Sequence, residues 1–557
     1  MRKKLLLLLG CFLLMLDVQA APAYAFRVKF KDKNGTLTFA DSLQFLSSKA
    51  LARRSNQGIL LDSTDLPVVK SYVDTVMVTS AAVKLHNVSK WFNQIVVNTF
   101  DSMKVVDIAA LPMVASLQLV ARYPNGVYKT EMVETNPKFS EPIDYNLHKT
   151  RGSSAYYGLA FQQIDMIGGD CLHDLGYKGE GMDVAIFDVN FRRTDSCSAY
   201  DSLLADQRVK DVHDFVRDTN FVYDMAINSD HGMNVLGCMA ANIPGTYVGT
   251  APHANFHLYI SEDVRTEQPI EEDNWLSAAE RSDSLGIYLI NSSLGYNLYT
   301  NLPSASYTYA DMDGKTSLIA QAANKAVAKG IFVVNAQGNE GAAAWHYMLT
   351  PADGDSVYSV GSVDGSGIWS GSGYGPTFDQ QIKPDGVALG KGVSLIGGTC
   401  GVGASNGSSF ASPIMCGAIT CLWQAAPHLK VWELRQLLHM VSSQYNTPDN
   451  TVGYGMPDFC QAYGIATNTS DITQIEYTFA CYPNPTNTGS FDVRCFNASV
   501  PSYSYAIYDI QGKLVYKSNE LHSNGFHCDA LQQSTKGQYV LVISTGLKQY
   551  SHKISKQ

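Results

Sequence analysis

Four polar residues that lie far apart in the chain have the types needed for acyl transfer: Asp188, His231, Asn339 and Ser409. A serine hydroxyl becomes a nucleophile when a histidine takes its proton, and a carboxylate can fix the tautomer of that histidine and stabilise its charge. An asparagine amide can donate to the oxyanion that forms on the attacked carbonyl. Together the four residue types predict hydrolysis through an acyl-enzyme.

Each of the four residues also has an ordinary structural explanation when it is taken alone. Ser409 stands near the start of the apolar stretch NGSSFASPIMCGAIT, where serine is a common helix N-cap. Asp188 ends an apolar strand, His231 opens a helical pattern, and Asn339 lies in a glycine-flanked turn, a place that asparagine tolerates well. Their joint occurrence at strand ends and helix starts of one domain is what favours chemistry.

The elements that must position these residues alternate between strands and helices from about residue 155 to 467. Buried-strand runs are GMDVAIFD, IYLINSSLG and GIFVVNAQGN, and helical patterns are HGMNVLGCMAANI, LIAQAANKAVAKG and ASPIMCGAITCLWQAA. This alternation predicts an α/β fold, a parallel sheet with helices on both faces and its site at the carboxyl ends of the strands.

Other segments flank this domain. Residues 26–123 alternate strand and helix patterns (FRVKFKDK, SLQFLSSKALARRSNQ, KWFNQIVVNTF) and predict a small α+β domain, and the polar stretch 124–154 predicts a linker. Residues 475–557 contain only short strands and turns, which predicts a small β-sandwich domain.

The first 25 residues, MRKKLLLLLGCFLLMLDVQAAPAYA, predict a secretory signal peptide because a basic start precedes a short apolar run and small residues. Cleavage after Ala20 or Ala25 fits, and LLGC offers a weaker lipoprotein alternative. Export makes disulfides among the eleven cysteines expected, although the sequence leaves their pairing open. Cys238 and Cys416 lie in apolar helical patterns and are predicted to be core residues. No CxxC pair occurs, so we expect no zinc site.

Charge and acidic motifs narrow the function further. A net charge of -10 argues against nucleic acid as a partner. DMDG at 311–314 resembles the start of a calcium loop, but the twelfth position is Ala322 and an EF-hand is excluded, so a turn before a helix is predicted. The acidic stretch 266–275 is interpreted as a helix N-terminus, with a subsite for basic substrate residues as the alternative.

The order Asp, His, Ser distinguishes the site from other arrangements of the same groups. The α/β-hydrolases run Ser, Asp, His with a GxSxG turn, and chymotrypsin-like enzymes run His, Asp, Ser. The motifs VAIFD, HGMNVLG and GSSFASP, with YSVGSVD and IKPDGVALG, resemble those of the subtilisin-like serine peptidases. The resemblance implies that Ser293, Leu294 and Gly295 pair with extended substrate.

The sequence departs from the family pattern at Val189-Asn190, Met233, Leu389 and Ser408, none of which supplies a proton-transfer or oxyanion group. The resemblance further implies that residues 26–123 are an inhibitory propeptide. The stretches CYPNPTNTGSFDV, AIYDIQGKLV and TKGQYVLVIS resemble the C-terminal sorting domain of type IX secretion, with an accessory binding module as the alternative.

These observations predict a secreted or cell-surface serine endopeptidase, exported through the periplasm of a Gram-negative bacterium. Its expected partners are protein or peptide substrates, its own propeptide and the type IX secretion machinery. We expect no cofactor and no catalytic metal, and the sequence leaves a structural calcium ion open. The resemblance implies that the segment GAAAWHYMLT after Asn339 lines the primary specificity pocket, and its apolar side chains predict a preference for apolar residues there. The alternatives are a catalytically silent surface binding protein on the same fold and an esterase with the same triad.

Overall fold

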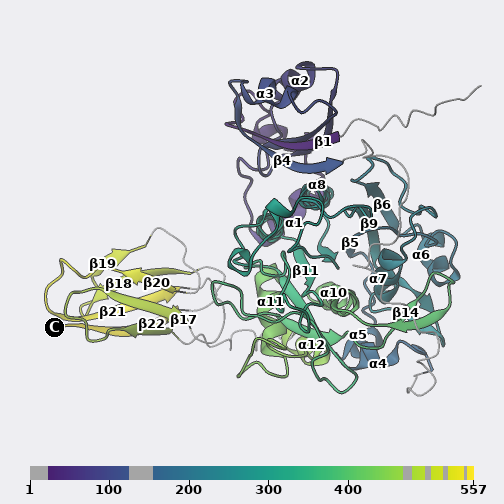
Figure 1. Ribbon diagram of the computed structural model, residues 1–557. Helices are drawn as coiled ribbons and strands as arrows, with labels where there is room; N and C mark the ends of the chain where they lie inside the picture. The colour runs from purple at the N-terminus through teal and green to yellow at the C-terminus, as the bar shows by residue number, and fades with distance from the viewer. Residues whose placement is uncertain (1–22, 124–154, 468–478, 496–502, 519–524, 545–548) are drawn as a thin grey trace, which may run out of the picture.

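The computed structural model describes residues 23–123, 155–467, 479–495, 503–518, 525–544 and 549–557. Figure 1 shows three parts: an N-terminal domain, a large α/β domain and a separate C-terminal domain of strands. Nearly all of the expected signal peptide, and the whole expected linker 124–154, lie outside the described residues. In the described ranges no helix is long and apolar enough to cross a membrane.

The α/β domain is built on a seven-stranded sheet with the strand order β13-β12-β11-β10-β5-β9-β6, and its neighbouring strands pair in parallel. This confirms the parallel sheet predicted from the alternating pattern. The strands are β5 (Asp183–Asp188), β6 (Val209–Asp214), β9 (Asn255–Ile260), β10 (Leu289–Ser292), β11 (Phe332–Ala336), β12 (Tyr358–Val363) and β13 (Gly386–Leu389).

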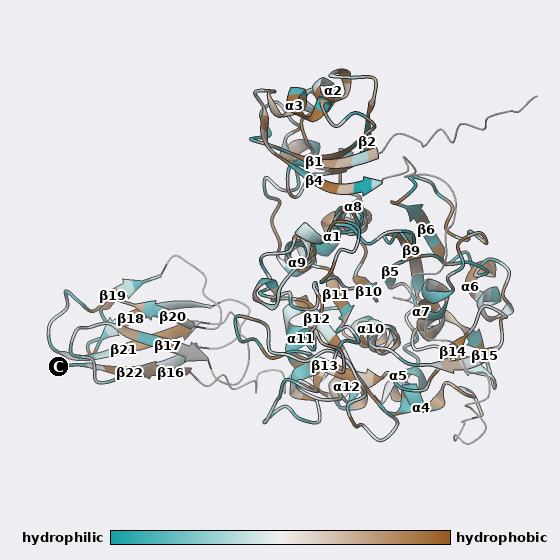
Figure 2. Ribbon diagram, in the orientation of Figure 1, coloured by the Kyte–Doolittle hydropathy of each residue, from teal (hydrophilic) through white to brown (hydrophobic). Residues whose placement is uncertain are grey.

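Helices cover both faces of this sheet, as the alternation of side chains along β5 demonstrates. Val184 and Ile186 join one buried cluster, whereas Ala185 and Phe187 join another, because successive strand residues point to opposite faces. The first cluster includes residues of α7 (His231–Ala240) and α10 (Ser408–Ala425). The second includes residues of α8 (Ile270–Leu285) and α9 (Leu318–Ala328). Figure 2 shows the brown of hydrophobic residues on the central strands β10 and β11.

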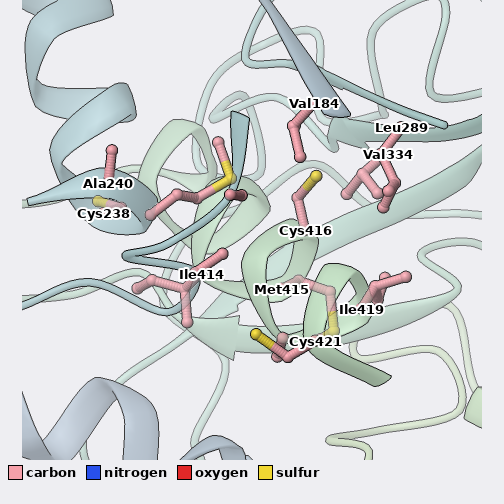
Figure 3. Close-up of a cluster of buried hydrophobic side chains, with 14 of the residues drawn as sticks. Val184, Cys238, Ala240, Leu289, Val334, Ile414, Met415, Cys416, Ile419 and Cys421 are labelled. Atoms are coloured by element: carbon pink, nitrogen blue, oxygen red, sulfur yellow. The ribbon is translucent and has the colours of Figure 1, made fainter. Parts of the chain in front are cut away.

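Helix α10 runs through the interior and is apolar around most of its circumference, as a helix buried on all sides must be. Figure 3 shows Cys416 and Ile419 of this helix near Val184, Leu289 and Val334 of the sheet. Cys416 of α10 and Cys238 of α7 are fully buried free thiols, which confirms their prediction as core residues.

Short elements and two disulfides complete the α/β domain. Cys171–Cys460 joins α5 to α12, and Cys197 is linked to Cys400 beside the β14–β15 hairpin. These elements are α4 (Phe161–Asp165), α5 (Gly169–Asp174), α6 (Asp201–Ala205), α11 (Val431–Met440), α12 (Phe459–Thr467), β7 (Asn242–Ile243), β8 (Tyr247–Val248), β14 (Val393–Ile396), β15 (Val402–Ser405), η4 (Ser198–Tyr200), η5 (Pro303–Ala305) and η6 (Tyr309–Asp311).

The N-terminal domain is an antiparallel sheet of order β2-β3-β1-β4 with helices, in agreement with the expected α+β unit. Strand β1 begins at Ala23, so cleavage after Ala20 keeps the strand whole and cleavage after Ala25 would shorten it. The elements are β1 (Ala23–Phe30), η1 (Phe39–Gln44), α1 (Ser48–Gln57), α2 (Lys70–Val78), β2 (Val83–Ser89), β3 (Gln94–Thr99), α3 (Lys104–Ala109) and β4 (Val114–Tyr123).

The C-terminal domain has two sheets, β16-β17-β20 and β19-β18-β21-β22, which share one apolar core. Phe491 and Val493 come from the first sheet, and Ile507 and Leu541 from the second. This agrees with the expected sandwich of short strands. Its strands are β16 (Phe479–Tyr482), β17 (Phe491–Cys495), β18 (Ser504–Asp509), β19 (Leu514–Lys517), β20 (Gly525–Cys528), β21 (Gly537–Ser544) and β22 (Gln549–Lys556).

The two acidic stretches lie where the sequence suggests. Asp313 Oδ1 accepts from the backbone N–H groups of Lys315 at 2.8 Å and Thr316 at 2.7 Å, which forms the predicted turn before α9. The second stretch supplies the first turn of α8, as interpreted. Its Asp273 is buried and forms an ion pair of 2.6 Å with Arg27 of β1.

Candidate active site

Asp188 and His231, which lie 43 positions apart, form a buried hydrogen-bonded pair. Asp188 is the last residue of β5 and His231 the first residue of α7. The His231 Nδ1 atom lies 2.8 Å from Asp188 Oδ1 and 3.0 Å from Oδ2, and the Val189 N–H donates to Oδ1 at 2.8 Å. A carboxylate beside Nδ1 holds the proton on that nitrogen, which makes Nε2 the basic nitrogen of the neutral ring.

A glycine after the histidine lets α7 approach the strand closely enough for this pair. A Cβ atom on Gly232 would lie 2.4 Å from the Asn190 carbonyl oxygen and 3.0 Å from the Asp188 Cβ. Any side chain at position 232 would therefore push the start of α7 away from β5. Asn190, a departure from the family pattern, anchors the neighbouring loop, since its Nδ2 donates to the Asp224 carbonyl at 2.8 Å.

Ser409 is the second residue of α10, and Gly407 rather than Ser409 holds the N-cap position. The helix-cap explanation of Ser409 is therefore not the arrangement observed. Its half-buried hydroxyl lies 3.4 Å from the Ser293 carbonyl oxygen. The ring of the next residue, Phe410, has its centroid 5.7 Å from that of the His231 imidazole, which places the start of α10 beside the Asp188–His231 pair.

A proline inside α10 explains a second contact of Ser409. Pro413 has no N–H, so the carbonyl of Ser409, four residues earlier, lacks its usual donor within the helix. The Ser293 hydroxyl donates to this carbonyl oxygen at 2.8 Å. Ser293 in turn accepts from Asn291 Nδ2 at 3.1 Å, and the Ser412 hydroxyl donates to Asn291 Oδ1 at 2.8 Å. This chain of side chains ties the first turn of α10 to the end of β10.

Asn339 follows β11 and faces the start of α10. Its Oδ1 accepts from the Ser408 N–H at 2.8 Å. The one proton of the Ser408 hydroxyl is shared between the same Oδ1 at 3.1 Å and the Gly338 carbonyl at 3.0 Å. Because donors surround the oxygen end of the amide, its orientation is determined and the Nδ2 end remains for donation. Sequence reasoning recorded Ser408 only as a departure and missed this positioning contact.

Ser293, Leu294 and Gly295 follow β10, beside Ser409, with the Leu294 carbonyl held by Asn335 Nδ2 at 3.0 Å. A Cβ atom on Gly295 would lie 2.6 Å from the Leu349 Cβ, and one on Gly338 would lie 2.9 Å from the Leu349 Cγ. Leu349 therefore fills the space between the two segments that flank Ser409. The sequence placed Leu349 in an apolar lining but did not indicate that its side chain is buried between Gly295 and Gly338.

Within the described residues, no group of three or more His, Cys, Asp or Glu side chains is placed to hold a metal ion.

Comparison with known proteins gives three family matches in chain order. Residues 25–136 match the peptidase S8 propeptide domain of Bacteroidota, residues 179–455 the subtilase family, and residues 480–557 the secretion system C-terminal sorting domain. Subtilisin NAT from Bacillus subtilis subsp. natto is 29% identical over 297 residues, which cover 52% of this chain and 68% of the relative.

Two further relatives also match about half of this chain. Subtilisin DY from Bacillus licheniformis is 29% identical over 282 residues, 49% of this chain and 88% of the relative. The membrane-bound transcription factor site-1 protease of Rattus norvegicus is 25% identical over 321 residues, 53% of this chain and 26% of the relative.

The parallel sheet and these matches define a serine-type endopeptidase with an N-terminal propeptide domain and a C-terminal sorting domain. The chain belongs to the subtilase family. Its sorting domain makes it a secreted or cell-surface protein, exported by type IX secretion in a Gram-negative bacterium.

Proposed function

We propose that the chain hydrolyses peptide bonds through Asp188, His231 and Ser409 and an acyl-enzyme intermediate, with Asn339 as an oxyanion donor. The observation that supports this most directly is the buried Asp188–His231 hydrogen bond of 2.8 Å beside the first turn of α10, which carries Ser409. That bond gives the histidine the tautomer a general base requires.

The acylation step uses all four groups. Ser409 Oγ attacks the carbonyl carbon of the scissile bond while its proton passes to His231 Nε2, and Asp188 stabilises the resulting imidazolium. The carbonyl oxygen becomes an oxyanion that accepts from Asn339 Nδ2 and from the backbone N–H of Ser409, one of the N–H groups at a helix start without an intrahelical partner. Collapse breaks the C–N bond, and His231 gives its proton to the leaving amine.

Deacylation repeats these steps with water. His231 takes a proton from water, the hydroxide attacks the ester carbonyl, and Ser409 Oγ leaves with the proton that His231 returns. Residues Ser293, Leu294 and Gly295 pair with the extended substrate as an added strand. The N-terminal domain inhibits the enzyme until it is removed.

The test is hydrolysis of a peptide library by the purified enzyme and its variants. Ser409→Ala, His231→Ala and Asp188→Asn should each nearly abolish turnover, and double variants should lose little more, because the three groups act as a unit. Ser196→Ala changes an exposed serine outside the site and is the matched control. A wild-type enzyme without hydrolysis would favour a silent binding protein, and near-normal turnover in one triad variant would disprove the role given to that residue.

Asn339→Ala separates oxyanion stabilisation from substrate binding. We expect kcat to fall by about 10²–10³, the loss typical of removing one such donor in this family, with little change in KM. An increase in KM at constant kcat would instead make Asn339 a ground-state binder.

A further inference from the structure

Helix α1 lies in the segment between β1 and α2, and it packs against the peptidase domain rather than against its own sheet. Figure 1 shows α1 beside α8, apart from α2 and α3. The helix rests on Gly286, where a Cβ atom would lie 2.6 Å from the Ala50 nitrogen, and the following residues reach Gly330, where a Cβ atom would lie 3.0 Å from Ile59 Cδ1. These glycines follow the C-terminal ends of α8 and α9.

An arginine pair on α1 enters this surface. Arg53 donates to Asp283 Oδ1 at 2.5 Å and to the Ile287 carbonyl at 2.5 Å, and Arg54 donates to both oxygens of Asp283 at 2.9 and 2.7 Å. The side chains of Arg53 and Asp283 have no exposed surface. The third cation near Asp283, Lys90 at 3.9 Å, also belongs to the N-terminal domain.

The position of Asp283 makes these cations important. It lies in the last turn of α8, where the helix dipole is negative and a buried carboxylate is doubly unfavourable. Cations at such a helix end are favourable, and here they are supplied by the propeptide domain. The network continues through Asp65, which accepts from Arg54 and lies 2.9 Å from the Lys329 ammonium group at the end of α9.

Polar contacts extend the surface at both ends of α1. The Ser47 N–H donates to the Ser284 carbonyl at 2.9 Å, and the Val431 N–H donates to Gln57 Oε1 at 2.9 Å. These contacts adjoin those of the propeptide sheet through Lys90, whose N–H donates to Glu280 at 2.8 Å and whose ammonium group donates to Ser284 Oγ at 2.7 Å. Helices α8 and α9 cover the face of the central sheet opposite to α7 and α10, which carry His231 and Ser409.

We propose that the surface between the ends of α8 and α9, centred on Asp283 and Lys329, is an exosite that recognises a dibasic helix. Its occupant is the propeptide segment 47–65, defined here as the arm. The exosite retains the cleaved propeptide on the enzyme from the face opposite the catalytic residues. The retention itself does not depend on catalysis. Only its consequence, that the peptidase stays inhibited for longer, rests on the proposed function.

The test measures release of the propeptide without using the enzyme's own activity. A recognition sequence for a site-specific protease is inserted between residues 124 and 154 of the full chain carrying Ser409→Ala. After cleavage, dissociation of the N-terminal fragment is followed by size-exclusion chromatography. Because breaking a buried ion pair leaves an uncompensated charge, Arg53→Gln with Arg54→Gln should speed dissociation at least about a hundredfold. Asp283→Asn should increase the dissociation rate less in the double arginine variant than it does in the chain with both arginines, because the same ion pairs are already lost.

Lys70→Gln is the matched control, since Lys70 forms an exposed ion pair with Asp74 inside α2. It removes one exposed positive charge outside the exosite and should leave dissociation unchanged. If the arginine variant fails to fold, a synthetic peptide of residues 46–66 is added to the cleaved, otherwise unaltered chain. It should compete for the exosite and speed release, whereas the peptide with both arginines changed to glutamine should not.

Equal dissociation rates for the arginine variant and the Lys70→Gln control would overturn the exosite, as would a competing peptide without effect. Neither result would bear on the proposed chemistry. Conversely, a catalytically silent enzyme that still holds its propeptide through the arm would refute the proposed function and leave the exosite intact.

Discussion

The contact between Ser293 and the carbonyl of Ser409 allows a prediction with an internal rescue. Ser293→Ala removes the hydroxyl that replaces the N–H missing from Pro413, so a carbonyl in the first turn of α10 loses its partner. Ser293 is 3% exposed, which leaves little room for water to substitute. An unsatisfied buried acceptor costs about 1–3 kcal/mol, or roughly a 5- to 150-fold change in local opening.

Hydrogen–deuterium exchange of the peptide around residues 406–416 measures this opening, with Ser409→Ala in every chain to prevent self-digestion. Exchange should accelerate by that factor in Ser293→Ala and remain near the reference in Ser293→Thr, which retains a hydroxyl. Pro413→Ala supplies an N–H that can donate to the residue 409 carbonyl. In this background Ser293→Ala should therefore have a much smaller effect, a coupling that a double-mutant cycle measures.

Two results would refute the reasoning. The first is unchanged exchange in Ser293→Ala, which would mean that the hydroxyl contributes nothing to holding the turn. The second is an equal effect of Ser293→Ala with proline or alanine at position 413, which would show that the loss arises elsewhere, for example at Asn291, whose Nδ2 donates to the same hydroxyl.

Other consequences can be measured independently. Leu349→Ala empties space between Gly295 and Gly338. It should therefore raise kcat/KM for peptides with a large apolar residue before the scissile bond by about 10- to 100-fold, relative to peptides with alanine at that position. An unchanged library profile would contradict this. Cys171→Ser with Cys460→Ser should cost about 2–5 kcal/mol in thermal unfolding, because the bond spans 289 residues. Burial holds the pKa of His173 at about 4, so below about pH 6.5 the unfolded chain takes up a proton that the folded chain does not. The free energy of unfolding should therefore fall by about 3 kcal/mol as the pH falls from about 6.5 to 4, and His173→Gln should reduce this pH dependence. Truncation near residue 470 should leave activity per folded molecule unchanged and strand the enzyme in the periplasm, as fractionation would show.

The sequence predicts the fold of the α/β domain and the candidate site for a physical reason. Buried strands of a parallel sheet are apolar without interruption, so they stand out, and their carboxyl ends meet at one edge. Polar residues at or just after those ends, such as Asp188 and Asn339, are therefore brought to the same edge of the sheet even when the chain separates them. The catalytic roles drawn from this remain predictions until turnover of the variants is measured.

Contacts that depend on tertiary packing are outside the reach of such patterns. The apolar composition around Leu349 indicates a lining, but only the approach of Gly295 and Gly338 determines that the side chain fills the space beside Ser409. The disulfide partners Cys171 and Cys460 belong to short helices whose meeting no local signal encodes.

The arginines of α1 show most clearly why local patterns fail where two domains meet. In sequence, Arg53 and Arg54 sit in a short polar helix, and such residues usually face water because burying a charge is costly. The compensation comes from Asp283, more than 200 positions later, at a helix end where a carboxylate is itself unfavourable. Each group is poorly placed in its own domain and well placed only in the complex. Charged residues that are buried in both of two domains, and that pair with each other, are therefore evidence for an interface. Here they identify the surface that recognises the arm.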